Sequence, residues 1–481
     1  EYVQSCRLLG ARNCSNARLL HNGELNTIRG NVDTMLAREE TIGSNYLKDD
    51  MTKVLPIVNQ GGSDSAQLDN TLEFMVMNGM DLPLAVMVTI PEPWDNNKSM
   101  DPKKRDFYQY YATMLEPWDG PASILFSDGD VMGAVLDRNG LRPSRYYITK
   151  DGRLILSSEV GVLDIPADEV VRKDRLRPGK MLLVDTVRGE LVDDEKLKAD
   201  YASRQPYGEW LDRNLVPLSS LKVPNKKVPS YTKDQLVQLQ KAFGYRYEDV
   251  STIILPMAKN GGELAVLSSQ HPPLFNYFKQ RFAQVTNPPI DALREKIVTS
   301  TTVYVGAQGN LLEEDADNCK VLKIENPILT ETDLLKIKAM DVPGFKVVTL
   351  SICYYKNTDL EKAIERLFVD VDRAYRDGAN ILILSDRDID EYHVAIPSLL
   401  AVGAVSKYLV RTRKRTAMAL ILESGEPRLV HDFATLLGYG AAAINPYLAQ
   451  ETIGELISDG LLDKDYYAAV SDYNKAVLAG I

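Results

Sequence analysis

The chain has 481 residues, of which 44% are hydrophobic and 26% are charged, a balance typical of a soluble globular protein with two or three domains. Its formal net charge of −11 argues against a nucleic-acid-binding surface, and no window approaches the ~18 apolar residues of a membrane span. The four cysteines and four histidines show no zinc or iron–sulfur spacing, so we predict no metal site and a reducing compartment.

The first third of the chain predicts helices followed by an antiparallel sheet. Residues 71–80 and 105–115 carry apolar side chains at helical spacing. Between residues 122 and 192, short apolar runs alternate with four dipeptides that end in glycine: Asp128-Gly129, Asn139-Gly140, Asp151-Gly152 and Arg188-Gly189. Such dipeptides favour the positive φ of tight turns, so we expect each to mark a hairpin.

The rest of the chain predicts a connector and then a parallel sheet. Residues 196–245 are polar and interrupted by prolines, with a helix over 232–243 that begins after Thr232. Beyond residue 246, buried apolar runs alternate with helical patterns, which is typical of βαβ units. The runs lie at 346–353, 380–386, 416–424 and 440–446, and the helices at 360–378, 396–411, 427–438 and 448–460. The predicted regions are therefore 1–195, 196–245 and 246–481.

Two short motifs could carry chemistry in the first region. In His21-Asn22-Gly23-Glu24, an amide side chain and an exposed backbone N–H together suit the stabilisation of an oxyanion. The alternative is an ordinary turn before a helix. In residues 61–65, GGSDS, the single carboxylate of Asp64 suits a ligand ammonium group. The alternative there is a helix N-terminus capped by serine and aspartate.

Four strings closely resemble the large (alpha) subunit of glutamate synthase, in the family's order: HNGELNTIRGN, GGSDS, DRNGLRP and FAQVTNPPID. The resemblance covers about residues 18–481 and implies an α+β then α/β fold. The first part would be a partial αββα N-terminal-nucleophile glutaminase sandwich, a class II glutamine amidotransferase domain. The second part would be the family's parallel α/β central domain.

The resemblance also implies roles for individual residues. Asn22 and Gly23 would form the oxyanion hole, Asp64 would hold the α-amino group of glutamine, and Gly62 would shape that pocket. Thr286 and Asn287 would line a tunnel for ammonia, with packing between domains as the alternative. Arg142 in the DRNGLRP string and Arg145 just after it would support the sheet.

The chain departs from the family at the catalytic N-terminus. A complete member begins with a cysteine whose own α-amine serves as base, whereas residue 1 is glutamate. Cys6 or Cys14 could supply the thiol and the free α-amine together only if cleavage made that cysteine the first residue. A complete member also has an FMN-binding barrel with a 3Fe-4S cluster, which would follow residue 481, so we expect no cofactor in this chain.

The sequence therefore predicts a fragment or truncated form of glutamate synthase, which makes glutamate from glutamine-derived ammonia and 2-oxoglutarate. We expect the isolated chain to be inactive without its partners: the FMN-domain portion, and an electron-donating small subunit or ferredoxin. No nucleic acid or membrane partner is expected, and the location would be cytoplasmic, or plastid in a plant. The alternative is a non-catalytic scaffold or glutamine-binding subunit that works with partner chains.

Overall fold

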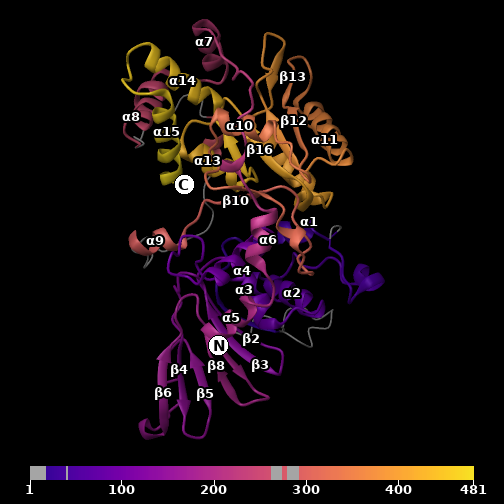
Figure 1. Cartoon of the computed structure of the whole chain (residues 1–481), viewed down its shortest axis with the longest axis vertical. Coiled ribbons are helices and arrows are strands. Elements are labelled where there is room, and N and C mark those ends of the chain that lie inside the picture. Colours follow the sequence, from indigo (N-terminus) through magenta and orange to yellow (C-terminus); the bar gives the residue numbers. More distant parts are fainter. Residues whose placement is uncertain (1–17, 40–41, 262–272, 279–291) are drawn as a thin grey trace. The chain divides into compact units, whose positions relative to one another are not determined.

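The computed structural model describes residues 18–39, 42–261, 273–278 and 292–481. They fall into two compact units that interleave along the chain (Figure 1). In the described part, the first unit holds residues up to 214 together with 292–300 and 308–319. The second unit holds the described residues of 215–278, then 301–307 and 320–481.

The first unit contains a five-stranded antiparallel sheet in the order β1-β2-β3-β7-β8. The bounds of its strands are Leu19–Gly23 (β1), Ala122–Ser127 (β2), Val131–Leu136 (β3), Met181–Asp185 (β7) and Glu190–Val192 (β8). Strand β1 is thus an edge strand in the described part of the sheet. Its position matters because it carries the His21-Asn22-Gly23 motif.

A second antiparallel sheet, in the order β5-β4-β6, packs on the first. Its strands are Arg145–Thr149 (β4), Leu154–Ser157 (β5) and Val170–Arg175 (β6). Leu136 and Leu182 of the first sheet form one apolar cluster with Tyr146 of the second. Because side chains alternate between faces, Ile124 and Phe126 are buried on the opposite face of the first sheet.

Helices complete the first unit, and α2 packs against β1. Their bounds are Ile28–Ala37 (α1), Asp64–Met77 (α2), Leu82–Thr89 (α3), Pro102–Ala112 (α4), Asp194–Ala202 (α5), Tyr207–Asn214 (α6) and Ala292–Val298 (α9). The observed layers are therefore helix, sheet and sheet. The second helical layer of the αββα sandwich stays a prediction.

The turn at Asn139-Gly140 corrects one prediction. The other three glycine-ending dipeptides do join paired strands, β2 to β3, β4 to β5 and β7 to β8. Asn139-Gly140 instead connects β3 of one sheet to β4 of the other, so it forms no hairpin. The reason is the buried carboxylate of Asp137, which accepts hydrogen bonds from the backbone N–H groups of Asn139, Gly140 and Leu141 and also from that of Ala122.

The second unit is built on a parallel sheet in the order β12-β14-β16-β17, which confirms the parallel arrangement expected from the apolar runs. Its strands are Val347–Ser351 (β12), Ile381–Ser385 (β14), Ala419–Glu423 (β16) and Ala443–Asn445 (β17). A three-stranded sheet has the order β10-β11-β9, formed by Val303–Val305 (β10), Leu322–Ile324 (β11) and Val216–Pro217 (β9). A two-stranded sheet pairs Cys353–Tyr355 (β13) with His393–Ala395 (β15).

Helices lie around this parallel sheet (Figure 1), most of them against its faces. They are Lys233–Ala242 (α7), Leu255–Asn260 (α8), Glu331–Lys338 (α10), Leu360–Arg376 (α11), Ser398–Arg411 (α12), Val430–Gly438 (α13), Tyr447–Ser458 (α14) and Tyr466–Gly480 (α15). Thr232 caps α7 in a capping box with Gln235, as the sequence predicted for its start.

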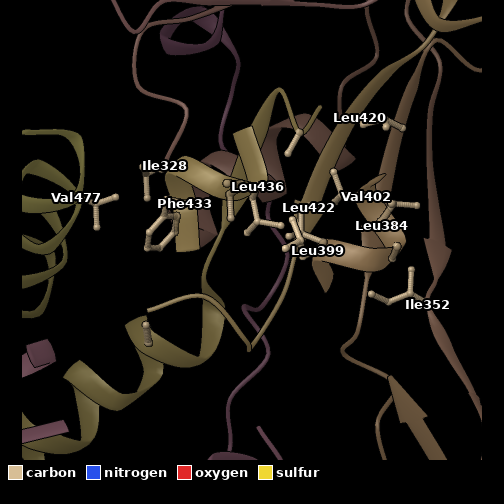
Figure 2. Packing of buried hydrophobic residues seen from close by; sticks show 14 of the residues in the cluster. Ile328, Ile352, Leu384, Leu399, Val402, Leu420, Leu422, Phe433, Leu436 and Val477 are labelled. Atoms are coloured by element: carbon tan, nitrogen blue, oxygen red, sulfur yellow. The ribbon is translucent and has the colours of Figure 1, made fainter. Parts of the chain in front are cut away.

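Both faces of the parallel sheet are buried, in two separate apolar clusters. On one face, Leu384 and Leu422 pack against side chains of α12, α13 and α15, such as Leu399, Phe433 and Val477 (Figure 2). On the other face, alternate residues of the same strands pack against α10 and the β10–β11 sheet. This double burial explains why the strands read as continuous apolar runs rather than as alternating patterns.

Residues 308–319 return to the first unit and bind its helices. Glu314 accepts hydrogen bonds from the hydroxyls of Tyr111 at 2.7 Å and Tyr207 at 2.6 Å. Asn318 donates to the hydroxyl of Tyr110 at 3.1 Å. These tyrosines are buried or nearly so on α4 and α6, so the returning segment is part of the core of the first unit.

Candidate functional site

The end of β1 lies unusually close to the chain entering β2. A Cβ atom on Gly23, whose φ is +153°, would lie 1.9 Å from the carbonyl oxygen of Pro121. On the opposite side, a Cβ on Gly120 would lie 2.0 Å from the carbonyl oxygen of Glu24. Only glycine fits either position, so the approach of the two strands fixes the backbone of the His21-Asn22-Gly23 segment.

The register of β1 and β2 shows where the backbone N–H of Gly23 points. Glu24 N donates to Pro121 O at 3.1 Å, and Ser127 N donates to Arg18 O at 2.9 Å. Hydrogen-bonded pairs alternate along an antiparallel ladder, so Asn22 bonds to β2 whereas the N–H of Gly23 points away from it. Because β1 is an edge strand in the described part of the sheet, this donor faces outward beside the exposed Asn22.

Helix α2 brings Asp64 to the same segment. Ser63 is the N-cap and accepts a hydrogen bond from Ala66 N, so Asp64 is the first helical residue, where a negative charge is favoured. Its Oδ2 accepts from Leu25 N at 2.9 Å, and its Oδ1 accepts from Ser65 N at 2.6 Å. The side chain keeps 21% exposure, so the carboxylate can still accept hydrogen bonds from a ligand.

His21 is a residue of this site that the sequence reasoning did not select. Its side chain is 3% exposed, and its Nδ1 lies 3.8 Å from Oδ2 of Asp64. Burial lowers its pKa below the ordinary value, against the opposing influence of Asp64 and Glu24, and Arg142 lowers it further. The only signal in the sequence was its place directly before Asn22.

Gly62 lies in the loop that leads into α2. Its N–H donates to Asn59 O at 3.0 Å, and a Cβ here would lie 3.2 Å from both Asn59 O and the Cβ of Ala66. The loop is therefore tightly folded against the first turn of the helix. The structure brings Gly62 and Asp64 to the helix end that faces the Leu19–Gly23 strand.

The remaining candidates divide between two situations. Thr286 and Asn287 lie outside the described residues, as do Cys6 and Cys14, so the tunnel and the nucleophile stay predictions. Arg142 is half-buried, and its positive charge helps to lower the pKa of His21. Arg145 begins β4, opposite Arg175 of β6, with an exposed side chain.

In the second unit, polar side chains gather where the parallel strands end. After β14, the buried carboxylate of Asp386 accepts from the Ser424 hydroxyl at 2.5 Å and from Gly425 N at 3.1 Å. Arg387 forms ion pairs with Glu331 and Glu423. Burial raises the pKa of Asp386 to about 7. These groups bond one another, as expected of loops that support the sheet.

The described residues do not fit a metal or an iron–sulfur cluster. They contain no group of three or more histidine, cysteine or acidic side chains that could hold a metal ion. Burial raises the pKa of Cys319 to about 11 and that of Cys353 to about 12, so both free thiols are protonated at neutral pH. The expectation that this chain binds no cofactor stays a prediction.

Comparison with known proteins identifies both parts of the chain. Residues 13–210 match the class-II glutamine amidotransferases. Residues 238–481 match the glutamate synthase central domain. The chain therefore belongs to the glutamate synthase family, which confirms the resemblance drawn from the four motifs.

Curated relatives cover nearly all of this chain. The glutamate synthase [NADPH] large chain of Bacillus subtilis is 45% identical over 97% of the chain and 31% of its own length. The glutamate synthase [NADH] of Schizosaccharomyces pombe is 42% identical over 96% of the chain and 23% of its own length. Ferredoxin-dependent glutamate synthase 2 of Synechocystis is 40% identical over 100% of the chain and 32% of its own length.

The chain thus spans about a third or less of the length of these relatives. The share of each relative that it covers runs from 23% to 32%. Among the residues that the structure describes, no helix is both long and apolar enough to cross a membrane.

Proposed function

We propose that this chain forms the glutamine-binding part of a glutamate synthase. In this proposal, Asp64 binds the α-ammonium group of glutamine, with Gly62 shaping the pocket. The side-chain amide of Asn22 and the backbone N–H of Gly23 stabilise the oxyanion formed when the glutamine carboxamide is attacked. The observation that carries the proposal is the outward N–H of Gly23 on β1, an edge strand in the described part of the sheet, together with the hydrogen bond from nearby Leu25 N to Asp64.

Each group suits its proposed task chemically. An oxyanion needs hydrogen-bond donors fixed in advance, and the close approach of Gly23 to Pro121 O fixes the backbone donor. An α-ammonium needs a carboxylate that is held in place and still has free lone pairs. Asp64 is held by Leu25 N and Ser65 N and is partly exposed.

The complete reaction rests on parts of the protein beyond this chain. We propose that ammonia released from glutamine converts 2-oxoglutarate to glutamate in the whole enzyme. The reduction would be carried out by an FMN-bearing portion and an electron donor, either a small subunit or ferredoxin. Thr286 and Asn287 are proposed to line the path of the ammonia. The chain alone would bind glutamine without turning it over.

Titration calorimetry of glutamine into the full chain tests the binding site. We compare glutamine with its analogue that lacks the α-amino group. Asp64→Asn should weaken glutamine at least about tenfold, because a charge-assisted hydrogen bond is lost, and should leave the analogue unchanged. Asp128→Asn, in the exposed β2–β3 turn, is the matched control and should bind as the unaltered chain does.

Equal losses for both ligands, or no loss in Asp64→Asn, would contradict the assigned role of Asp64. Co-expression with the remaining portion of the enzyme then separates the two predicted functions. Recovery of glutaminase activity supports the hypothesis that the chain is a functional part of the enzyme. Binding without turnover, even with the partner present, supports a glutamine-binding or scaffold subunit.

A further inference from the structure

His21 lies directly beside the carboxylate to which we assign the ligand ammonium. Its imidazole is on the inward face of β1, and its Nδ1 is 3.8 Å from Oδ2 of Asp64. This separation is too long for a hydrogen bond, but it is within the range of an ion pair once the imidazole carries a charge. The Nε2 atom is buried and has no hydrogen-bond partner among the described residues.

Within the part of the chain that the structure describes, the hydrogen bonds that the Asp64 carboxylate accepts come from backbone groups. Two backbone N–H groups, those of Leu25 and Ser65, hold its oxygens in place. Neither donor is charged, so the negative charge is available to a cation at the exposed side of the carboxylate. His21 is the neighbour that could neutralise this charge by taking up a proton.

We propose that His21 is a positioning residue whose protonation state controls how strongly Asp64 binds an ammonium ligand. When His21 is neutral, the full negative charge of Asp64 is available to the ligand. When His21 takes a proton from solvent, the imidazolium pairs with Asp64 and competes with the ligand ammonium. The inference rests on the proposed function, because that function supplies the ligand.

The charged groups around His21 set the direction of the effect. Asp64 faces it from α2 and Glu24 from the end of β1, and both favour its charged form, whereas Arg142 after β3 disfavours it. Burial is the largest influence and lowers the pKa of His21 below 6.5. His21 is therefore neutral at neutral pH, and the protonated form accumulates only as the solution becomes acidic. Ligand affinity should consequently fall as the pH falls.

The pH dependence of glutamine binding to the full chain tests the proposal. As the pH is lowered from about 8 to about 5, the affinity of the unaltered chain should fall progressively, whereas that of His21→Gln should change little. The analogue without an α-amino group should show no such fall. His393→Gln is the matched control, because His393 also lies beside a carboxylate, with its Nδ1 2.9 Å from Asp390, but in the second unit.

A second measurement uses the unaltered chain and does not depend on the folding of a variant. With only four histidines, the imidazole signals can be resolved by NMR after selective labelling and assigned by single substitutions. Coupling between two binding events is reciprocal, so bound glutamine must lower the pKa of His21 if protonated His21 weakens glutamine. The NMR signals of His393, in the second unit, serve as the internal reference.

The outcomes separate the inference from the proposed function. If the chain binds no glutamine at any pH, or if Asp64→Asn binds it normally, the proposed function fails and the inference fails with it. If binding depends on Asp64 but His21→Gln keeps the acid-dependent weakening, only the inference is wrong. An unchanged titration of His21 on addition of glutamine would also overturn it.

Discussion

Replacing Asp137 by alanine should lower the free energy of unfolding of the first unit by about 3 kcal/mol. The carboxylate is 2% exposed and accepts hydrogen bonds from four backbone N–H groups, at 2.9 to 3.3 Å. A hydrogen bond to a charged group contributes ~1.5–3 kcal/mol, and a buried donor left unpaired costs ~1–3 kcal/mol. Ala122 is 1% exposed, so water cannot replace its lost partner, whereas the half-buried turn residues can be hydrated.

Asp128 provides the matched control for this substitution. Its Oδ1 accepts from the N–H groups of Asp130 and Val131 in the exposed β2–β3 turn. Because water can replace both bonds, Asp128→Ala should cost only ~0.5–1 kcal/mol. Asp137→Asn keeps the volume and one acceptor oxygen but places an amide donor opposite a donor, so its cost should fall between those of the two alanine variants.

Urea unfolding followed by tryptophan fluorescence measures this difference cleanly. All three tryptophans, Trp94, Trp118 and Trp210, belong to the first unit, so the signal reports on that unit alone. With a slope of roughly 3 kcal/mol per molar urea, Asp137→Ala should lower the midpoint by about 1 M. Equal midpoints for Asp137→Ala and Asp128→Ala would refute the reasoning, since it depends on burial of the first carboxylate.

Three further predictions concern other parts of the chain. Gly23→Ala should destabilise the first unit by more than ~2 kcal/mol, because its Cβ would meet Pro121 O at 1.9 Å, whereas Gly30→Ala has open space around its Cβ and should be neutral or stabilising in the same fluorescence assay. Leu422→Ala, fully buried in the second unit, should cost ~2–5 kcal/mol by hydrogen exchange of β16, and a loss below ~1 kcal/mol would contradict its place in the core. The pKa of Asp386 is raised from 3.8 to about 7 in the folded chain. Between these two pH values the folded state holds the proton and the unfolded state does not, so the stability of the second unit should fall as the pH rises from 3.8 to about 7. Asp386→Asn should reduce the slope of stability against pH, measured by the same hydrogen exchange. An unchanged slope would contradict the role of Asp386 in this pH dependence.

The parallel sheet could be predicted because its strands are buried on both faces. Each apolar run contains an observed strand, for example Ile381–Ser385 within 380–386, and each helical pattern overlaps an observed helix. The start of α7 was also readable, since Thr232 and Gln235 form a local capping box. In these elements the local sequence preferences and the burial of the side chains favour the same structure, so the sequence pattern predicts the observed strands and helices.

Features that depend on distant contacts could not be predicted. The Asn139-Gly140 turn has the sequence of a hairpin, but the buried Asp137 sends the chain to another sheet. The approach of His21 to Asp64 joins a strand and a helix that are distant in sequence. The roles of Asn22, Gly23 and Asp64 came from the family resemblance, and they stay predictions. The structure adds the direction of the Gly23 N–H and the donors that hold Asp64.

The return of residues 308–319 to the first unit has a consequence for synthesis of the protein. A ribosome releases the chain from its N-terminus, so the tyrosines of α4 and α6 emerge well before Glu314, their hydrogen-bond acceptor. The first unit therefore cannot complete its core until residue 319 has left the ribosome. By then the 215–278 part of the second unit has already emerged. Neither unit can finish folding before synthesis of the other has begun, and a gene cut between the two family matches would encode an incomplete first unit.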